Sequence, residues 1–319
     1  MHVERISYLG LHNCYRFDNG AIEVIVTTDV GPRVIRYAFV GASNVFGEYP
    51  ERSTSTQWGD WKPRGGHRLW AAPEAMPRSY APDNSPIAFE IQSDRAIRLQ
   101  QSTDLSGLEK QMTVSVETHG TAVCVDHKIT NRSLWPIELA PWAITIVRGG
   151  LAILPLEPWR SHREALGPAQ PLVRWYFTDF TDPRLQLGRS SIRMRADATL
   201  QHPQKIGILN RCGWCAHWAA GTLFVKHFDV EKRAHGADYG ANNEAYVAGE
   251  YMELESLGPL QRLAPNESAA HRERWELFRH GELSDSEPRV MDALHSLLHR
   301  GDSNRSIDTS SPHGAPARR

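Results

Sequence analysis

Two glutamates lie two residues apart in the segment AYVAGEYMELESLGPL. The alternation of side chains along a β-strand places Tyr251, Glu253 and Glu255 on one face. Met252 and Leu254 then point to the opposite face. Where water is excluded, two carboxylates this close disfavour joint ionisation, which raises the pKa of one of them toward the range of a general acid or base. An exposed strand face with two ordinary acids has the same pattern, so the spacing alone leaves both interpretations open.

A second segment, WKPRGGHRLWAAPE, brings four chemically useful side chains together behind a glycine pair that permits a tight turn. His67 can transfer a proton near neutral pH, and Arg68 can bind a carboxylate or hydroxyl groups. Trp70 offers a flat apolar face to a sugar ring, and Glu74 follows four residues later. The alternative is a glycine-containing connector whose apolar side chains fill the core and whose His67 and Arg68 are solvated.

Other candidates lie in connecting segments and beside tryptophans, where long loops often carry function. The predicted substrate-binding residues comprise Arg68, Trp70, Glu74, Asp83, Asn84, Trp142, Arg160, His162, Lys226, Tyr239 and Glu244. The last three lie upstream of the Glu253 strand, and we expect them to form a wall of the same cleft.

The elements that position these residues are predicted from two-residue alternation of apolar and polar side chains, which is typical of half-buried strands. Many such strands without interspersed helical patterns indicate an all-β sandwich of antiparallel sheets. The predicted strands cover residues 21–28, 33–40, 87–92, 96–101, 112–117, 123–130, 142–148, 190–196, 221–228, 246–256 and 273–279.

The C-terminal region departs from this pattern. Val290 and Leu294 lie at helical spacing after a serine and a proline that favour a helix start, so we predict one helix within residues 281–300. The small, polar segment 301–319 is predicted to be disordered, because it has too little apolar surface to offset the entropy of ordering. Residues 1–280 are then predicted to form one β-sandwich domain.

The composition restricts the class of partner. The 36 basic and 37 acidic side chains are interspersed and give a formal net charge of −1, which disfavours nucleic acid and anionic membranes. No apolar run is long enough for a signal peptide or a membrane span, and four cysteines are too few for a disulfide framework. We therefore expect a cytoplasmic protein, either a monomer or a homodimer.

Ten short segments together resemble the galactose-mutarotase-like proteins of the aldose 1-epimerase superfamily, and more closely a bacterial branch of it. The resemblance implies a supersandwich of antiparallel sheets, and it extends in order from about residue 20 to residue 278. The matching segments are GGHRLWAAPE, YAPDN, LSGLEKQMTVSV, ITNRSLWPIELAPWAIT, LPLEPWRSH, YFTDFTDPRL, PQKIGI, FVKHF, NNEAY and YMELESLGPL.

The resemblance also implies roles for particular residues. In aldose 1-epimerases of this fold, a strand with the pattern L-E-x-Q-x-L-P supplies a glutamate that takes the proton of the anomeric hydroxyl, while a histidine protonates the ring oxygen. MELESLGP looks like that strand, which implies Glu253 as the base and Glu255 in place of the glutamine. The family's acid histidine follows a Thr-Asn pair, where this sequence has Arg132. His67 or His162 is therefore expected to serve as the acid.

These observations predict a carbohydrate-active protein, an aldose-1-epimerase-type isomerase of a monosaccharide or sugar acid with catalytic Glu253, His67 and Glu255. Ring opening needs a proton-transfer pair and no cofactor, and no metal site is predicted. Two alternatives stay open: a non-catalytic carbohydrate-binding or sensing protein, and a lyase of a uronate-type substrate. The expected partner is a small carbohydrate.

Overall fold

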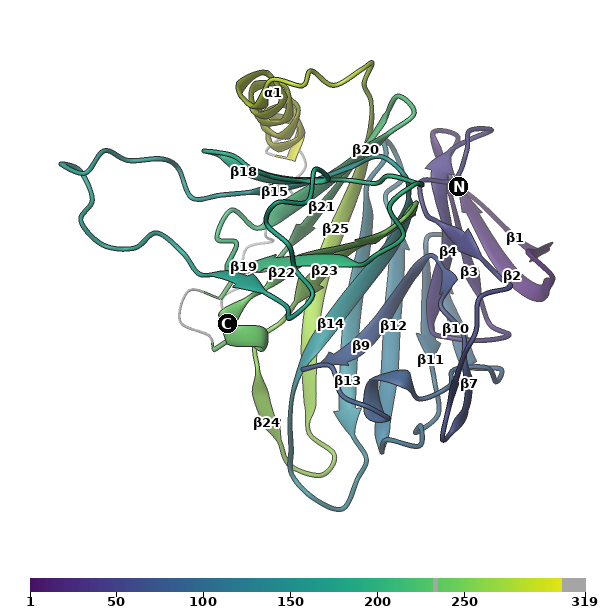
Figure 1. The fold of residues 1–319 in the computed structure, drawn as a ribbon. Coiled ribbons are helices and arrows are strands. Elements are labelled where there is room, and N and C mark those ends of the chain that lie inside the picture. The colour runs from purple at the N-terminus through teal and green to yellow at the C-terminus, as the bar shows by residue number, and fades with distance from the viewer. Residues whose placement is uncertain (232–234, 306–319) are drawn as a thin grey trace, which may run out of the picture. The chain divides into compact units, whose positions relative to one another are not determined.

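The computed structural model describes residues 1–231 and 235–305 (Figure 1). The chain divides into two compact units, residues 1–281 and residues 282–319. The first unit contains two large sheets, and every strand pair in it is antiparallel, as in Trp142 against Leu257 or Val125 against Glu273. The predicted all-β class with one C-terminal helix is thereby confirmed.

The larger sheet has 11 strands and carries the predicted Glu253 strand near its middle. Its order is β1 (His2–Tyr8), β2 (Leu11–Asp18), β3 (Ile22–Thr27), β4 (Arg33–Phe39), β9 (His67–Ala72), β14 (Ile137–Arg148), β23 (Tyr251–Leu257), β22 (Asn243–Ala248), β19 (Gln204–Ile208) and β16 (Leu172–Arg174), with β24 (Gln261–Leu263) paired to β14.

The second sheet has 10 strands, and two small hairpins lie outside both sheets. Its order is β10 (Ala88–Ser93), β11 (Ala96–Gln100), β12 (Leu108–Val116), β13 (Val123–Asn131), β25 (Ser268–Arg279), β21 (Thr222–Phe228), β20 (Trp214–Ala219), β15 (Leu151–Pro155), β18 (Ser191–Arg195) and β17 (Leu185–Leu187). The hairpins pair β5 (Glu48–Tyr49) with β8 (Arg64–Gly65) and β6 (Thr54–Thr56) with β7 (Gly59–Trp61), and two short 3-10 turns are η1 (Arg78–Tyr80) and η2 (Asp238–Gly240).

One apolar core fills the space between the two sheets, with β14 of the larger sheet against β13 and β25 of the smaller (Figure 1). Met112 and Val125 contribute to it from the smaller sheet, and Leu69 and Leu254 from the larger one. Strand β12 alternates strictly between buried and half-buried side chains, as its sequence predicts. Strand β9 is buried along its whole length, because its other face is covered as well.

Several predicted elements differ from the sequence-based expectation. The strands β12, β14 and β25 begin four or five residues before the predicted starts at 112, 142 and 273. The expected strand 246–256 is a hairpin, since β22 ends at Ala248 and β23 begins at Tyr251 after a turn in which Gly249 has φ +63°. The sequence leaves open whether the segment after the glycine pair is a connector. In the structure it is the strand β9, which lies inside the larger sheet.

The C-terminal helix α1 spans Glu287–Arg305, so it begins inside the predicted segment 281–300 and ends five residues beyond it. It continues through Gly301, because one glycine inside a helix costs only about 1 kcal/mol relative to alanine. Of the predicted disordered tail, residues 301–305 are helical, and residues 306–319 lie outside the described part of the chain. Within the described residues, no helix has the length and apolar character to cross a bilayer.

Candidate functional site

A cavity of about 740 Å³ lies over the face of the larger sheet that is turned away from the core. Along β9, Arg68 and Trp70 line the cavity while Leu69 between them points into the core. Along β23, Tyr251 and Glu253 line it in the same way. The remaining lining residues come from β6, β7, β14, β19, β22, the η1 turn and the connecting segments: Glu51, Arg52, Ser53, Thr54, Trp61, Pro63, Glu74, Met76, Tyr80, Trp142, Ile144, Trp175, Phe177, Pro203, Lys205, Tyr246 and Ala248.

Aromatic rings form much of the cavity wall. Trp61, Trp70 and Tyr80 contact one another, with ring centroids 5.0 to 5.3 Å apart. Trp142 meets Trp70 edge to face at 5.4 Å. Flat apolar walls with a few polar groups between them are characteristic of sites for small ligands that have both polar and apolar faces.

Glu253 presents one carboxylate oxygen to this cavity. Its Oε1 accepts hydrogen bonds from the Tyr251 hydroxyl at 2.6 Å and from Arg68 Nη2 at 3.0 Å. Its Oε2 accepts none from any described residue, and the side chain is 13% exposed. The carboxylate is therefore fixed through one oxygen, while the other is available to a ligand.

Arg68 orients Glu253 from a position enclosed by aromatic rings. Its guanidinium lies 5.0 Å from the Trp61 ring centroid and 4.6 Å from that of Trp70. The Nε and Nη1 atoms are buried and have no hydrogen-bond partner. In this position the guanidinium offers a ligand little free donor surface, and its defined contact is with the Glu253 carboxylate.

Glu255 lies deeper than Glu253, in a buried group with Lys205 and Glu244. The Lys205 ammonium is 2.9 Å from Glu255 Oε2 and 2.8 Å from Glu244 Oε2, and Trp142 Nε1 donates to Glu255 at 2.7 Å. Burial raises the pKa of Glu244 well above its usual value, and Lys205 offsets this only in part. Both carboxyl groups thus lie beside the same ammonium, and burial favours the neutral form of Glu244.

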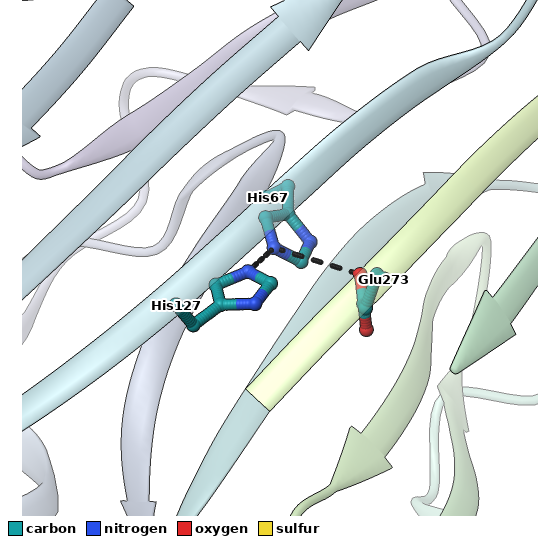
Figure 2. A group of neighbouring side chains, drawn as sticks. All are labelled: His67, His127 and Glu273. Atoms are coloured by element: carbon teal, nitrogen blue, oxygen red, sulfur yellow. Dashed lines mark hydrogen bonds and ion pairs between the residues drawn. The ribbon is translucent and has the colours of Figure 1, made fainter. Parts of the chain in front are cut away.

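His67 points to the opposite side of its strand, away from the cavity. It is fully buried between the sheets, with Nδ1 2.8 Å from Thr145 Oγ1 and Nε2 2.7 Å from His127 Nε2 (Figure 2). His127 Nδ1 in turn donates to the backbone carbonyl of His271 at 3.0 Å. The expected role of His67 as the acid is therefore corrected, because residues of odd and even number on β9 face opposite sides and only the even ones reach the cavity.

Lys226 belongs to the same inter-sheet cluster rather than to the cavity. Its ammonium is 2.8 Å from Glu273 Oε1 and donates to the carbonyls of Ala143 and Leu254, each at 3.1 Å. Trp275 Nε1 donates to the second Glu273 oxygen at 2.8 Å. The prediction that Lys226 binds substrate is therefore wrong. Its contacts join β14 and β23 on the core side of the larger sheet.

Among the described residues, His67, His127 and Glu273 form the one group whose potential metal-ligand atoms lie within 4.8 Å of one another (Figure 2). Both oxygens of Glu273 are already engaged, by Lys226 and Trp275. A divalent cation would place further positive charge beside the buried Lys226 ammonium, with one carboxylate to compensate both. The residues therefore do not fit a metal ion, and they act as a hydrogen-bonded layer inside the sandwich.

Comparison with known proteins supports the fold through structure rather than sequence. No protein-family model and no curated protein matches the chain. A candidate mutarotase from Salmonella typhimurium superimposes with a TM-score of 0.57 at 12% identity, over 87% of this chain and 94% of its own. A galactose mutarotase-like protein from Lactobacillus casei gives 0.52 at 10% identity, over 83% and 100%. The chain has the galactose mutarotase-like fold.

The same fold also occurs inside a larger protein. A TPR-domain containing protein from Parabacteroides distasonis matches 95% of this chain with a TM-score of 0.56 at 12% identity, and the match covers 56% of that protein. The galactose mutarotase-like fold can therefore stand alone or form part of a longer chain, and activity has to be argued from the site.

In this galactose mutarotase-like domain, the cavity gathers five of the predicted site residues. They are Arg68, Trp70, Glu74, Trp142 and Glu253. Glu244 and Glu255 lie next to its wall through their contacts with Lys205.

Four other predicted residues lie outside the cavity, so the prediction that they line it is wrong. Asp83 accepts from Arg33 Nη2 at 2.7 Å. Its neighbour Asn84 is exposed and bonds Arg64 at 2.7 Å. Arg160 lines a separate cavity of about 530 Å³, and His162 is exposed in the same loop. Each belongs to a connection whose course over the surface cannot be read from strand alternation.

Tyr239 is also outside the cavity. It is 93% exposed in the η2 turn, where it has φ +57°. It lines a small surface hollow with Trp175 and Tyr176 instead. Proximity in sequence to the Glu253 strand predicts a place in the cavity wall, but the η2 turn directs the Tyr239 side chain outward.

Sequence reasoning missed several residues that line the cavity. Lys205 and Tyr246 lie on β19 and β22, inside the segments PQKIGI and NNEAY that carry the family resemblance. Alternation with the core residues Ile206 and Val247 places both on the cavity side, and this signal could have identified them. Trp61 ends the short hairpin strand β7, and Trp175 lies in a connecting segment, so neither has neighbours whose periodicity marks the cavity face.

Proposed function

We propose that the cavity binds an aldose or a sugar acid and that the protein interconverts its anomers, with Glu253 as the general base. The observation that carries this proposal is the Glu253 carboxylate, fixed through Oε1 by Tyr251 and Arg68 and open to the cavity through Oε2. The aromatic walls suit the apolar faces of a sugar ring. The galactose mutarotase-like fold agrees with this assignment.

The proposed reaction requires two proton transfers. Glu253 Oε2 takes the proton of the anomeric hydroxyl while the bond between the anomeric carbon and the ring oxygen breaks, and an acid protonates that ring oxygen. The open-chain aldehyde rotates about its terminal carbon–carbon bond. Reclosure on the other face returns both protons and gives the opposite anomer, so atoms balance without a co-reactant.

A carbohydrate-binding module without turnover is the second candidate. It is favoured by the occurrence of this fold as part of a TPR-domain containing protein. In that role Glu253 would accept a hydrogen bond from a sugar hydroxyl and transfer no proton.

One sequence of experiments separates these functions. Thermal-shift measurements on the wild-type protein, with a panel of neutral aldoses, uronates and sugar phosphates, identify ligands that raise Tm. Exchange NMR on each hit then measures interconversion of its anomers. Exchange faster than the uncatalysed rate supports the isomerase, and binding without exchange supports the module. A panel without a single hit would contradict both.

A further inference from the structure

The proposed reaction needs an acid for the ring oxygen, and most hydroxyl and ammonium donors along the cavity are already in use. The hydroxyl of Tyr80 donates to Glu74, and that of Tyr251 donates to Glu253. The Lys205 ammonium contacts the carboxyl groups of Glu244 and Glu255 and lies 4.7 Å from the ring centroids of both Trp142 and Trp175. His67 is separated from the cavity by its own strand.

Tyr246 is the cavity phenol whose hydroxyl has no hydrogen-bond partner among the described residues. It lines the cavity from β22, and its residue pairs directly with Glu253 across the β22–β23 ladder. Directly paired residues on one sheet face have Cβ atoms about 5 Å apart. The Tyr246 and Glu253 side chains therefore stand side by side on the cavity face of the sheet, and the longer tyrosine reaches further from it.

The protonation state of Tyr246 suits a donor. Burial raises the pKa of its phenol, and the negative charge of Glu253 acts in the same direction, so the hydroxyl keeps its proton at neutral pH. Lys205 is the competing donor. Burial lowers its pKa, but Glu244 and Glu255 more than offset this, so the ammonium holds its proton more tightly than usual.

We propose that the Tyr246 hydroxyl donates the proton to the sugar ring oxygen while Glu253 removes the proton of the anomeric hydroxyl. This inference rests on the proposed isomerase function. A sugar's anomeric and ring oxygens are bonded to the same carbon, so the base and the acid must lie close together. Glu253 and Tyr246 meet this requirement because they are directly paired residues on one sheet face. On reclosure the phenolate takes the proton back from the ring-forming hydroxyl, and Glu253 returns its own to the carbonyl oxygen.

The test compares Tyr246→Phe with Tyr176→Phe, in which the lost hydroxyl is fully exposed and outside the cavity. For anomer exchange of the sugar identified by thermal shift, Tyr246→Phe is expected to lower kcat by about 100-fold, the usual contribution of a general acid. KM is expected to change by less than about threefold, because few ground-state contacts are lost. Tyr176→Phe keeps the wild-type kcat.

A second variant distinguishes proton donation from packing. Replacing Tyr246 by 3,5-difluorotyrosine keeps the ring and lowers the phenol pKa, so the alkaline fall of kcat is expected to move to lower pH. An unchanged alkaline limb, or a Tyr246→Phe protein with wild-type kcat, overturns the inference. If Glu253→Gln is inactive while Tyr246→Phe is fully active, the proposed function stands and the inference alone fails. Absence of exchange in the wild-type protein overturns both.

Discussion

Glu253 and Glu255 share one strand face, but their surroundings give them different roles. Glu253 keeps one oxygen open to the cavity, whereas Glu255 is fully buried against Lys205 and Trp142. Sequence alternation correctly placed both glutamates on the face opposite Met252 and Leu254. It could not separate them, because Lys205 comes from a strand 50 residues away.

The Lys205 group gives a prediction at the residue scale. Lys205→Met should lower the free energy of unfolding by about 3–5 kcal/mol, because it leaves the charge of Glu255 buried without a countercharge. Glu244→Gln should lower it by less than about 1 kcal/mol, since burial favours the neutral form of that carboxyl and glutamine has nearly the same shape. Urea unfolding measures both, and equal losses would contradict this distribution of charge.

At the scale of elements, β9 explains the errors in the site prediction. Its sequence HRLWAA lacks a clear alternation of apolar and polar residues because both faces are covered. Polar His67 faces the core and apolar Trp70 faces the cavity, so side-chain polarity gave the wrong side for His67. A buried polar cluster between two sheets leaves no mark in the sequence, since its partners are distributed over β13, β14 and β25.

The entry to β9 gives a prediction at this scale. Gly66 has φ +73°, and a Cβ there would lie 2.2 Å from the carbonyl oxygen of Val34 on the adjacent strand. Gly120 has φ +75° with no atom within 4 Å of its Cβ position, so Gly120→Ala is the matched control. The control should lose about 1 kcal/mol of stability from backbone strain alone.

Gly66→Ala should lose at least about 3 kcal/mol, because the strand must also move away from its neighbour. Urea denaturation of both variants checks the difference. Equal losses would mean that the close approach of β9 to β4 is not required by the fold.

At the scale of the whole molecule, buried neutral histidines make stability depend on pH. Burial lowers the pKa of His217 to about 4, and its Nε2 donates to the carbonyl of Gly149 at 2.8 Å. The unfolded chain binds this proton near pH 6.5, so the contribution of His217 is complete above about pH 6.5 and is lost as the pH falls to about 4.

His217→Gln keeps a donor at this position and removes the titration. Between about pH 6.5 and about pH 4, wild-type stability should fall more steeply than that of the variant, by about 1 kcal/mol per pH unit. Urea unfolding at intervals of half a pH unit measures the slopes, with exposed His119→Gln as the control. Parallel curves for wild type and His217→Gln would show that His217 is not held neutral.

The architecture could be predicted well from the sequence, because many strands share the same alternation of apolar and polar side chains. Alternation located strands such as β11 and β13 closely, and ten short segments identified the fold that solved structures confirm. The site was predicted only in part. Strand faces can be inferred where apolar neighbours mark the core, as for Glu253, but loops such as the one with Arg160 and His162 carry no such marker.

The most direct test of the central claim is anomer exchange catalysed by wild type and Glu253→Gln on one sugar that raises Tm in both. Glu90→Gln, which alters an exposed ion pair with Arg98 on the other sheet, is the control. If Glu253 is the base, the glutamine variant keeps the affinity and loses about 10²- to 10⁴-fold in kcat, while the control is unchanged. Wild-type exchange in Glu253→Gln would contradict the assignment of this carboxylate as the base.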